Sequence, residues 1–295
     1  MAFAKTDDNV DLYYEVTGQG TPIVFIHEFA GNYQSWEPQV AHFSRWHTCL
    51  TFNARGYPPS QVPADADAYS QQRAVRDVLA VMDAAGIQQA HIVGLSMGGF
   101  AALHLGLDFP QRALSLCIAG AGYGAEPEKQ EIFQRETRNT AALILEEGVE
   151  KFAQKYSRGP TRLSFERNDP RGYAEFQKLL ASQSAQGLAN TQLGVQLRRP
   201  SLYDLQEKMA QLTLPTLVIT GDEDVPCLMP GFLMKTTIPS AMLSVVPNCG
   251  HTINLEAPGE FNRIVESFLA QAESGCWPQR SYSLTANTVT GMSKP

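Results

Sequence analysis

The sequence has no surplus of basic residues and no long apolar run, and these gaps exclude several classes of function. Its 295 residues include 23 lysine and arginine against 30 aspartate and glutamate, which gives a net charge of −7. A nucleic-acid partner is not expected, because neutralising phosphates requires clustered lysine and arginine. No stretch approaches the apolar length of a membrane span, and the first ten residues lack the apolar segment of a signal peptide. We therefore expect a cytoplasmic protein of bacterial type without a membrane partner.

Paired cysteines are also missing. The five cysteines are scattered and include no CxxC pair, so neither a disulfide framework nor a zinc site is expected. Cys49 and Cys117 lie inside apolar runs and are interpreted as small core residues. The chain shows no dinucleotide-binding fingerprint and no metal-ligand cluster, so no cofactor is expected. The sequence leaves open whether the chain forms a homodimer.

What the sequence does contain is a regular alternation of short apolar runs and helical patterns. This alternation is typical of an α/β fold with a mostly parallel sheet and helices on both of its faces. Eight strands are expected, at residues 2–6, 10–17, 22–27, 48–52, 91–95, 113–119, 216–220 and 242–246. Helices are expected at residues 70–85, 97–109 and 259–272, the first with Ser70 as its N-cap and Gly86 as its stop.

The middle of the chain has a different pattern. Between residues 122 and 212 no strand-like run occurs, and apolar residues recur at helical spacing among frequent charges. We therefore expect a core domain formed by residues 1–121 and 213–273, with a helical lid insertion at residues 122–212. Residues 274–295 form a polar tail that either packs as an extended strip or is mobile.

The strongest functional motif is Gly94-Leu95-Ser96-Met97-Gly98-Gly99, which follows an apolar strand and begins a helix. A nucleophilic serine must project from a tight, strained turn, so small residues are needed two positions before and after it. At the helix N-terminus, backbone N–H groups and the helix dipole favour developing negative charge. A glycine-rich connection without chemistry would have the same composition, but the strand before it and the helix after it favour a catalytic Ser96.

With this motif in place, the sequence resembles the α/β-hydrolase-fold superfamily, in particular its lid-bearing serine esterases and lactonases. The resemblance covers about residues 10–272. It rests on His27-Glu28-Phe29-Ala30-Gly31, Gly94 to Gly99, Gly221-Asp222-Glu223-Asp224 and Gly250-His251. It implies an eight-stranded α/β-hydrolase sheet and the chain order serine, acid, histidine.

His251 is the expected general base. It lies in a loop beyond the last expected strand, at the sheet edge from which an imidazole can reach Ser96. The other candidates are interpreted as packed or surface histidines; they are His42, His47, His91 and His104.

The acid that orients the imidazole should follow the strand at residues 216–220, where Asp222, Glu223 and Asp224 compete. The resemblance assigns Asp224, because the family pattern after this strand is Gly-x-x-Asp. Asp222 is the second choice and is interpreted as a turn residue. Glu126 is the third, since some members of the family place the acid after the preceding strand.

Two backbone N–H groups should bind the oxyanion that forms during acyl transfer. One is expected from Met97, the residue after the nucleophile. By resemblance to the family's His-Gly-x pattern, the other is the N–H of Phe29, with His27 holding the loop.

Glu28 departs from the family pattern, which has glycine at this position. A free carboxylate facing the oxyanion would oppose catalysis by like-charge repulsion. We hypothesise a structural ion pair between Glu28 and Arg55, whose loop is expected to brace the oxyanion loop. Alternatively, Glu28 points away from the site or positions water or substrate.

The expected lid carries several aromatic residues, some of which should cover the cleft above Ser96; they are Tyr123, Phe133, Phe152, Tyr156, Phe165, Tyr173 and Phe176. Pockets of this kind are mostly apolar with a few placed polar groups. Arg198 and Arg199 could bind a substrate carboxylate, although an Arg-Arg-Pro sequence near a helix end is more often surface charge.

These features predict a serine hydrolase that cleaves a small or medium carboxylic ester or lactone through an acyl-enzyme. Hydrolysis of a carbon–carbon bond in a ring-cleavage diketone is the first alternative, because it uses the same serine, histidine and aspartate. Cofactor-free perhydrolysis has only the Ser-Met-Gly-Gly sequence in its favour. An alternative of another class is a ligand-binding receptor on a hydrolase scaffold.

Overall fold

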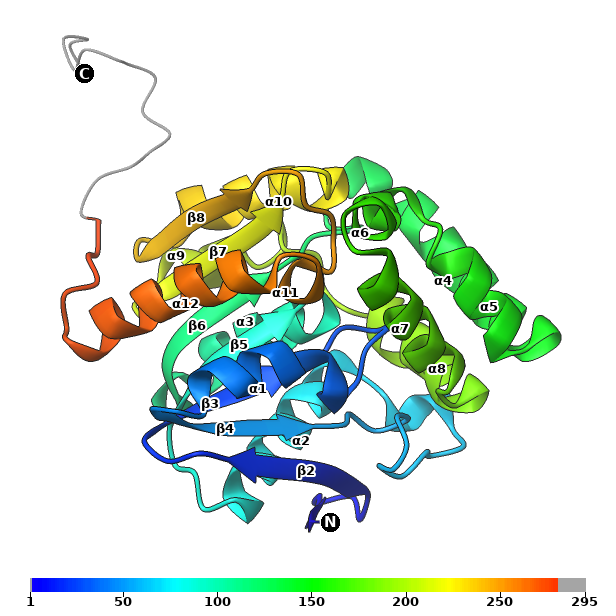
Figure 1. Cartoon of the computed structure of the whole chain (residues 1–295), viewed down its shortest axis with the longest axis horizontal. Coiled ribbons are helices and arrows are strands. Elements are labelled where there is room, and N and C mark those ends of the chain that lie inside the picture. The colour runs from blue at the N-terminus through cyan, green and yellow to red at the C-terminus, as the bar shows by residue number, and fades with distance from the viewer. Residues whose placement is uncertain (1, 281–295) are drawn as a thin grey trace, which may run out of the picture.

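The computed structural model describes residues 2–280 and places an eight-stranded sheet at the centre of the molecule (Figure 1). The strands are β1 (Ala2–Lys5), β2 (Asp11–Thr17), β3 (Thr21–Ile26), β4 (His47–Phe52), β5 (Ala90–Leu95), β6 (Ala113–Ala119), β7 (Thr216–Gly221) and β8 (Ala241–Val246). Their order in the sheet is β1-β2-β4-β3-β5-β6-β7-β8. The β1–β2 and β2–β4 pairs are antiparallel, and all others are parallel. The eight expected strands are thus confirmed, each to within one residue.

The sheet is covered on both faces, which explains its continuous apolar strands. Every residue of β5 and β7 is buried, as parallel strands sandwiched between helices should be. Along β3 the side chains alternate between two core clusters. Val24 and Ile26 face the cluster under α2 and α3, whereas Ile23 and Phe25 face the cluster under α1 and α12.

The helices are α1 (Glu37–Phe43), α2 (Gln71–Ala84), α3 (Met97–Asp108), α4 (Gln130–Glu147), α5 (Val149–Tyr156), α6 (Leu163–Asn168), α7 (Pro170–Ala181), α8 (Ala185–Thr191), α9 (Gln206–Ala210), α10 (Val225–Thr237), α11 (Ile253–Glu256) and α12 (Pro258–Glu273). The helices expected from the pattern correspond to α2, α3 and α12, and the Ser70 hydroxyl caps α2 by accepting from the Arg73 amide. Helix α10 is not among the helices expected from the pattern, and it contains Pro230. Among the helices of residues 2–280, none combines the length and apolar character needed to cross a bilayer.

Helices α4 to α9 lie between β6 and β7 in the sequence, and no strand interrupts that stretch. Figure 1 shows α4, α5, α7 and α8 gathered beside one end of the sheet. Their buried side chains Phe152, Phe165 and Phe176 share a core cluster with Phe29 and Met97. Because Phe29 follows β3 and Met97 follows β5, this helical segment packs over the carboxyl ends of the parallel strands.

The described end of the chain packs back onto the core. The Trp277 ring lies 4.7 Å from the Phe268 ring, and its Nε1 donates to the Ser240 carbonyl at 2.7 Å. The Arg280 amide donates to the Pro239 carbonyl at 3.1 Å. The polar tail expected at residues 274–295 therefore begins as a packed extended strip, and residues 281–295 lie outside the described part of the chain.

Candidate active site

Ser96 occupies a strained turn between β5 and α3. Its backbone has φ 56° and ψ −112°, a left-handed conformation that non-glycine residues rarely adopt. The Ser96 amide donates to the Ala119 carbonyl at 2.8 Å, which ties the turn to the end of β6. Ser96 itself is partly exposed in an otherwise buried stretch. The Ser96 backbone is therefore strained, and this turn carries the Ser96 hydroxyl at the carboxyl edge of the sheet.

The glycines on either side of Ser96 are required by close packing of backbone on backbone. A Cβ at Gly94 would lie 2.0 Å from the Gly98 carbonyl oxygen, and one at Gly98 would lie 2.1 Å from the Ile26 carbonyl oxygen. No side chain fits at such distances. The second contact also brings the start of α3 against the end of β3, so the loop that carries Phe29 is next to the turn that carries Ser96.

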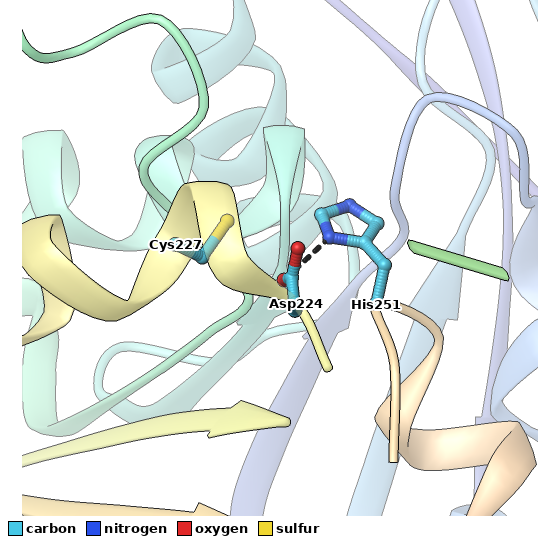
Figure 2. A group of neighbouring side chains, drawn as sticks. All are labelled: Asp224, Cys227 and His251. Carbon is cyan, nitrogen blue, oxygen red and sulfur yellow. Dashed lines mark hydrogen bonds and ion pairs between the residues drawn. The ribbon is translucent and has the colours of Figure 1, made fainter. Parts of the chain in front are cut away.

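His251 and Asp224 meet at the same edge of the sheet (Figure 2). His251 follows β8 and Asp224 follows β7, and the His251 Nδ1 lies 2.7 Å from the Asp224 Oδ2. The side chains are 11% and 1% exposed, respectively. Parallel strands end at one edge, and for this reason residues so far apart in the sequence converge.

The competing acids have other partners. Asp222 accepts from the Cys249 amide at 3.1 Å and so fastens the loop before His251. Glu223 forms a surface ion pair with Arg167, at 2.8 Å. Glu126 pairs with Lys129. Asp224 is the acid that the structure brings to the imidazole.

The electrostatics of His251 suit a base that is charged for part of a reaction cycle. Burial works to lower the pKa of His251, but the adjacent Asp224 carboxylate outweighs it and holds the pKa above its ordinary value. Gly120, the residue after β6, lies near both the His251 imidazole and the end of β5 that leads into Ser96. A Cβ built there would lie 3.5 Å from the His251 Cε1 and 3.2 Å from the Leu95 Cδ1, and Leu95 directly precedes Ser96.

The amides of Phe29 and Met97 are both free to donate a hydrogen bond to a ligand. Among residues 2–280, neither amide donates a hydrogen bond to another protein group. Met97 is the first residue of α3, where N–H groups are unsatisfied within the helix. Phe29 is held from behind, because the Tyr57 hydroxyl donates to its carbonyl at 2.9 Å. Two unpaired amides beside a strained serine form a suitable site for an oxyanion.

His27 bridges the loop after β3 and the loop after β4. Its Nδ1–H donates to the Glu28 carbonyl at 2.7 Å, and its Nε2 accepts from the Ala54 amide at 3.0 Å. Burial lowers the pKa of His27 to about 4, so the ring is neutral, as these two bonds require.

The hypothesis that Glu28 pairs with Arg55 is wrong. Arg55 binds Asp77 through Nε and Nη2, both at 2.7 Å, and binds Asp8 through Nη1 at 2.8 Å. Glu28 instead forms a bidentate pair with Arg162, with Nη2–Oε2 at 2.6 Å and Nη1–Oε1 at 3.2 Å. The two acids near Arg55 already saturate it, and the Glu28 carboxylate is turned toward the helical segment.

The Glu28–Arg162 pair is buried on all sides. The two side chains are 2% and 3% exposed. The Arg162 guanidinium lies 5.0 Å from the centroid of the Tyr156 ring and 4.8 Å from that of Phe176. It also donates to the Thr252 hydroxyl, next to His251. Burial works to raise the pKa of Glu28, but Arg162 outweighs it, so the carboxyl is ionised and neutralised.

Sequence reasoning missed this segment of the site entirely. Besides Arg162, the neighbouring Thr161 carbonyl accepts from the His251 amide at 2.8 Å. One turn between α5 and α6 therefore holds both the loop after β3, which carries Glu28, and the loop that carries His251. No local pattern around Arg162 marks it, because its partner Glu28 is 134 positions away in the sequence.

Asp224, Cys227 and His251 form a group of possible metal ligands (Figure 2). Their nitrogen, oxygen and sulfur atoms lie within 4.8 Å of one another. Cys227 sits on the first turn of α10 and its Sγ–H donates to the Gly120 carbonyl at 3.4 Å. Within this group, Asp224 and His251 already bond each other.

The chain shows similarity to known hydrolases over most of its length. A family model described as alpha/beta hydrolase fold matches residues 21–258. The 3-oxoadipate enol-lactonase 1 of Acinetobacter baylyi is 29% identical over 256 residues, which cover 84% of this chain and 88% of that protein. The 2-hydroxy-6-oxo-6-phenylhexa-2,4-dienoate hydrolase of Burkholderia cepacia is 27% identical over 283 residues, 89% and 92% of the two chains. The crystal structure of the enol-lactonase from Burkholderia xenovorans LB400 superposes with a TM-score of 0.79 at 23% identity, covering 91% of this chain and 100% of that one, and supports the fold.

Proposed function

Because the chain belongs to the alpha/beta hydrolase fold family, we propose that it is a serine hydrolase that cleaves a small or medium carboxylic ester or lactone. In this proposal Ser96 is the nucleophile, His251 the general base and Asp224 the orienting acid. One observation carries the proposal. A serine held at φ 56° stands at the same sheet edge as a buried His251–Asp224 pair separated by 2.7 Å.

The proposed reaction proceeds in two acyl-transfer steps. The Ser96 Oγ attacks the carbonyl carbon while the His251 Nε2 takes the hydroxyl proton. The resulting oxyanion accepts hydrogen bonds from the Phe29 and Met97 amides. Protonated His251 then gives its proton to the leaving alcohol, and a water molecule deprotonated by the same imidazole releases the acid and Ser96. Asp224 keeps the proton of Nδ1 in place and stabilises the charged ring.

We further propose that residues 122–212 act as a lid over this site. Phe152 and Tyr156 of α5 lie against Phe29, with ring centroids 6.1 and 5.8 Å from it. Such a roof excludes water and offers an apolar surface, which favours an acyl group of modest size.

Carbon–carbon bond hydrolysis of a ring-cleavage diketone is the second candidate. It is favoured by the similarity to the phenylhexadienoate hydrolase, whose identity to this chain nearly equals that of the enol-lactonase. Both reactions would use the same Ser96, His251 and Asp224, so residues of the site do not separate them.

The proposal is tested with purified full-length protein and its Ser96→Ala variant. We expect turnover of p-nitrophenyl acetate by the wild type and a loss of at least about 10³-fold in Ser96→Ala. A panel of esters of increasing acyl length, lactones and ring-cleavage diketones then ranks the substrate classes by kcat/KM. Tight binding of panel members without turnover would instead indicate a ligand-binding receptor on this fold.

A further inference from the structure

A cavity of about 250 Å³ lies beside the first turn of α3, and it is distinct from the packed core. Its walls come from that turn, the loop after β6, the start of α4 and residues 197–204. Phe100 and Phe133 supply apolar surface, and Arg198, Arg199 and Asp204 supply charge. The cavity is large enough for a small organic group, and its chemistry depends on which of these charges are already paired.

Arg199 carries a charge that no carboxylate of the described residues neutralises. Its guanidinium lies 3.8 Å from the Phe100 ring centroid and 4.9 Å from that of Phe133. It donates only to neutral oxygens, those of the Gln196 side chain and the Tyr123 carbonyl. Burial lowers the pKa of Arg199 to about 9. The Arg199 side chain is partly exposed, and its five N–H donors exceed the acceptors found here.

The two other charged residues of the cavity are engaged elsewhere. Arg198 has a side chain 54% exposed and pairs with Asp67 at 2.7 Å. Asp204 accepts from the Ser201 amide at 3.2 Å, and no ion pair joins it to Arg199 within residues 2–280. Within residues 2–280 neither Arg199 nor Asp204 forms an ion pair, so Arg199 is the cation of this cavity that lacks a bonded counter-ion.

Arg199 is also close to the proposed chemistry. The Phe100 amide donates to the Ser96 carbonyl at 3.0 Å, so the ring under Arg199 is one helical turn from the nucleophile. Tyr123, which accepts from Arg199, belongs to the same loop as Gly120, the residue that contacts His251.

We propose that Arg199 binds a carboxylate at the far end of the substrate, so that the enzyme prefers esters or lactones that carry a second, ionised acid group. This inference rests on the proposed hydrolase function and narrows its substrate class. A bidentate guanidinium–carboxylate pair on a partly desolvated site supplies both affinity and orientation. The Phe100 and Phe133 rings hold the guanidinium plane in place for it.

The test compares two p-nitrophenyl esters that differ in one charge, the glutarate monoester and the neutral pentanoate. The wild type is expected to have a higher kcat/KM for the charged ester. In Arg199→Met, the ratio of charged to neutral kcat/KM should fall about 10- to 100-fold, mostly through KM. Arg171→Met is the control, because Arg171 is exposed and lies outside the cavity, and its ratio should stay within about twofold of wild type. An unchanged ratio in Arg199→Met overturns the proposal.

A second measurement needs no variant. Free glutarate should inhibit hydrolysis of the neutral ester by wild type competitively, whereas the uncharged glutaramide should not inhibit. Non-competitive inhibition would place the anion outside the substrate site and would also overturn the proposal, as would equal inhibition by both compounds. If the neutral ester and the other panel substrates are not turned over at all, the hydrolase function fails. Binding of an anion at Arg199 is then tested separately: glutarate should raise the melting temperature of wild type and should have no effect on Arg199→Met.

Discussion

The buried pair between Glu28 and Arg162 yields the sharpest quantitative prediction. Replacing Glu28 by glutamine keeps the size of the side chain and removes its charge. Arg162 then stays buried at 3% exposure, with only neutral oxygens as acceptors, those of Thr252, Tyr156 and the new amide. Breaking a buried ion pair in this way costs about 3–5 kcal/mol. At roughly 2–4 °C per kcal/mol for a large domain, we expect Glu28→Gln to lower Tm by about 10 °C.

Two control variants separate this effect from a general loss of charge. Arg171 and Glu175 form an ion pair with side chains 91% and 69% exposed, so Glu175→Gln should cost about 0.5 kcal/mol or less. The double variant Glu28→Gln with Arg162→Met removes the stranded cation and should regain about 2 kcal/mol or more of the loss. Chemical denaturation of the four proteins measures all of these values. A loss below about 1 kcal/mol in Glu28→Gln would refute the buried-pair account.

The same pair predicts a pH dependence. The pKa of Glu28 in the folded protein lies below its ordinary value because Arg162 outweighs burial. Stability from such a carboxylate is fully present above its unfolded pKa of about 4.3 and is lost as pH falls through the folded pKa. The stability difference between wild type and Glu28→Gln should be constant above about pH 5 and should shrink below about pH 4. A difference that widens on acidification would contradict this sign.

The remaining predictions concern the imidazole, the turn and the thiols. The acidic limb of the kcat/KM profile should lie above about pH 6.5, because Asp224 raises the pKa of His251 despite burial. A limb at or below that pH would contradict the assignment of His251 as the base. Asp224→Asn should lower kcat about 10³- to 10⁴-fold. Gly98→Ala should lower the free energy of unfolding by about 1–3 kcal/mol, since its Cβ would meet a β3 carbonyl oxygen at 2.1 Å. In the same denaturation assay Gly259→Ala should be neutral or stabilising, because a Cβ there lies in open space. A colorimetric thiol reagent should modify Cys276 rapidly and the other four cysteines only on unfolding, because only Cys276 is exposed; fast labelling in Cys276→Ser would refute this.

Much of the fold could be predicted from the sequence because its signals are local. The apolar runs of β3, β5 and β7 and the glycines around Ser96 each follow from constraints within a few residues. That an acid after β7 would meet His251 could be expected as well, because the two segments follow neighbouring parallel strands that end at one edge. The choice of Asp224 over Asp222 and Glu223 came from the family resemblance.

The partner of Glu28 could not be predicted for the opposite reason. The choice between Arg55 and Arg162 depends on where a helical segment more than a hundred residues later folds back over the sheet. Arg55 was a reasonable candidate by its position after β4, but Asp8 and Asp77 supply it with closer acids. Side-chain partners over such separations are determined by tertiary packing, which leaves no local pattern. The same holds for Arg199, whose lack of a counter-ion is visible only in three dimensions.

The central claim is that Ser96 is the nucleophile, and covalent labelling tests it most directly. Diisopropyl fluorophosphate transfers its phosphoryl group to an activated serine with loss of fluoride, and peptide mass spectrometry locates the adduct. We predict a single adduct on the peptide that contains Ser96, formed in step with the loss of esterase activity, and no adduct in Ser96→Ala. Inactivation with Ser96 unmodified, or full activity of Ser96→Ala, would contradict the account.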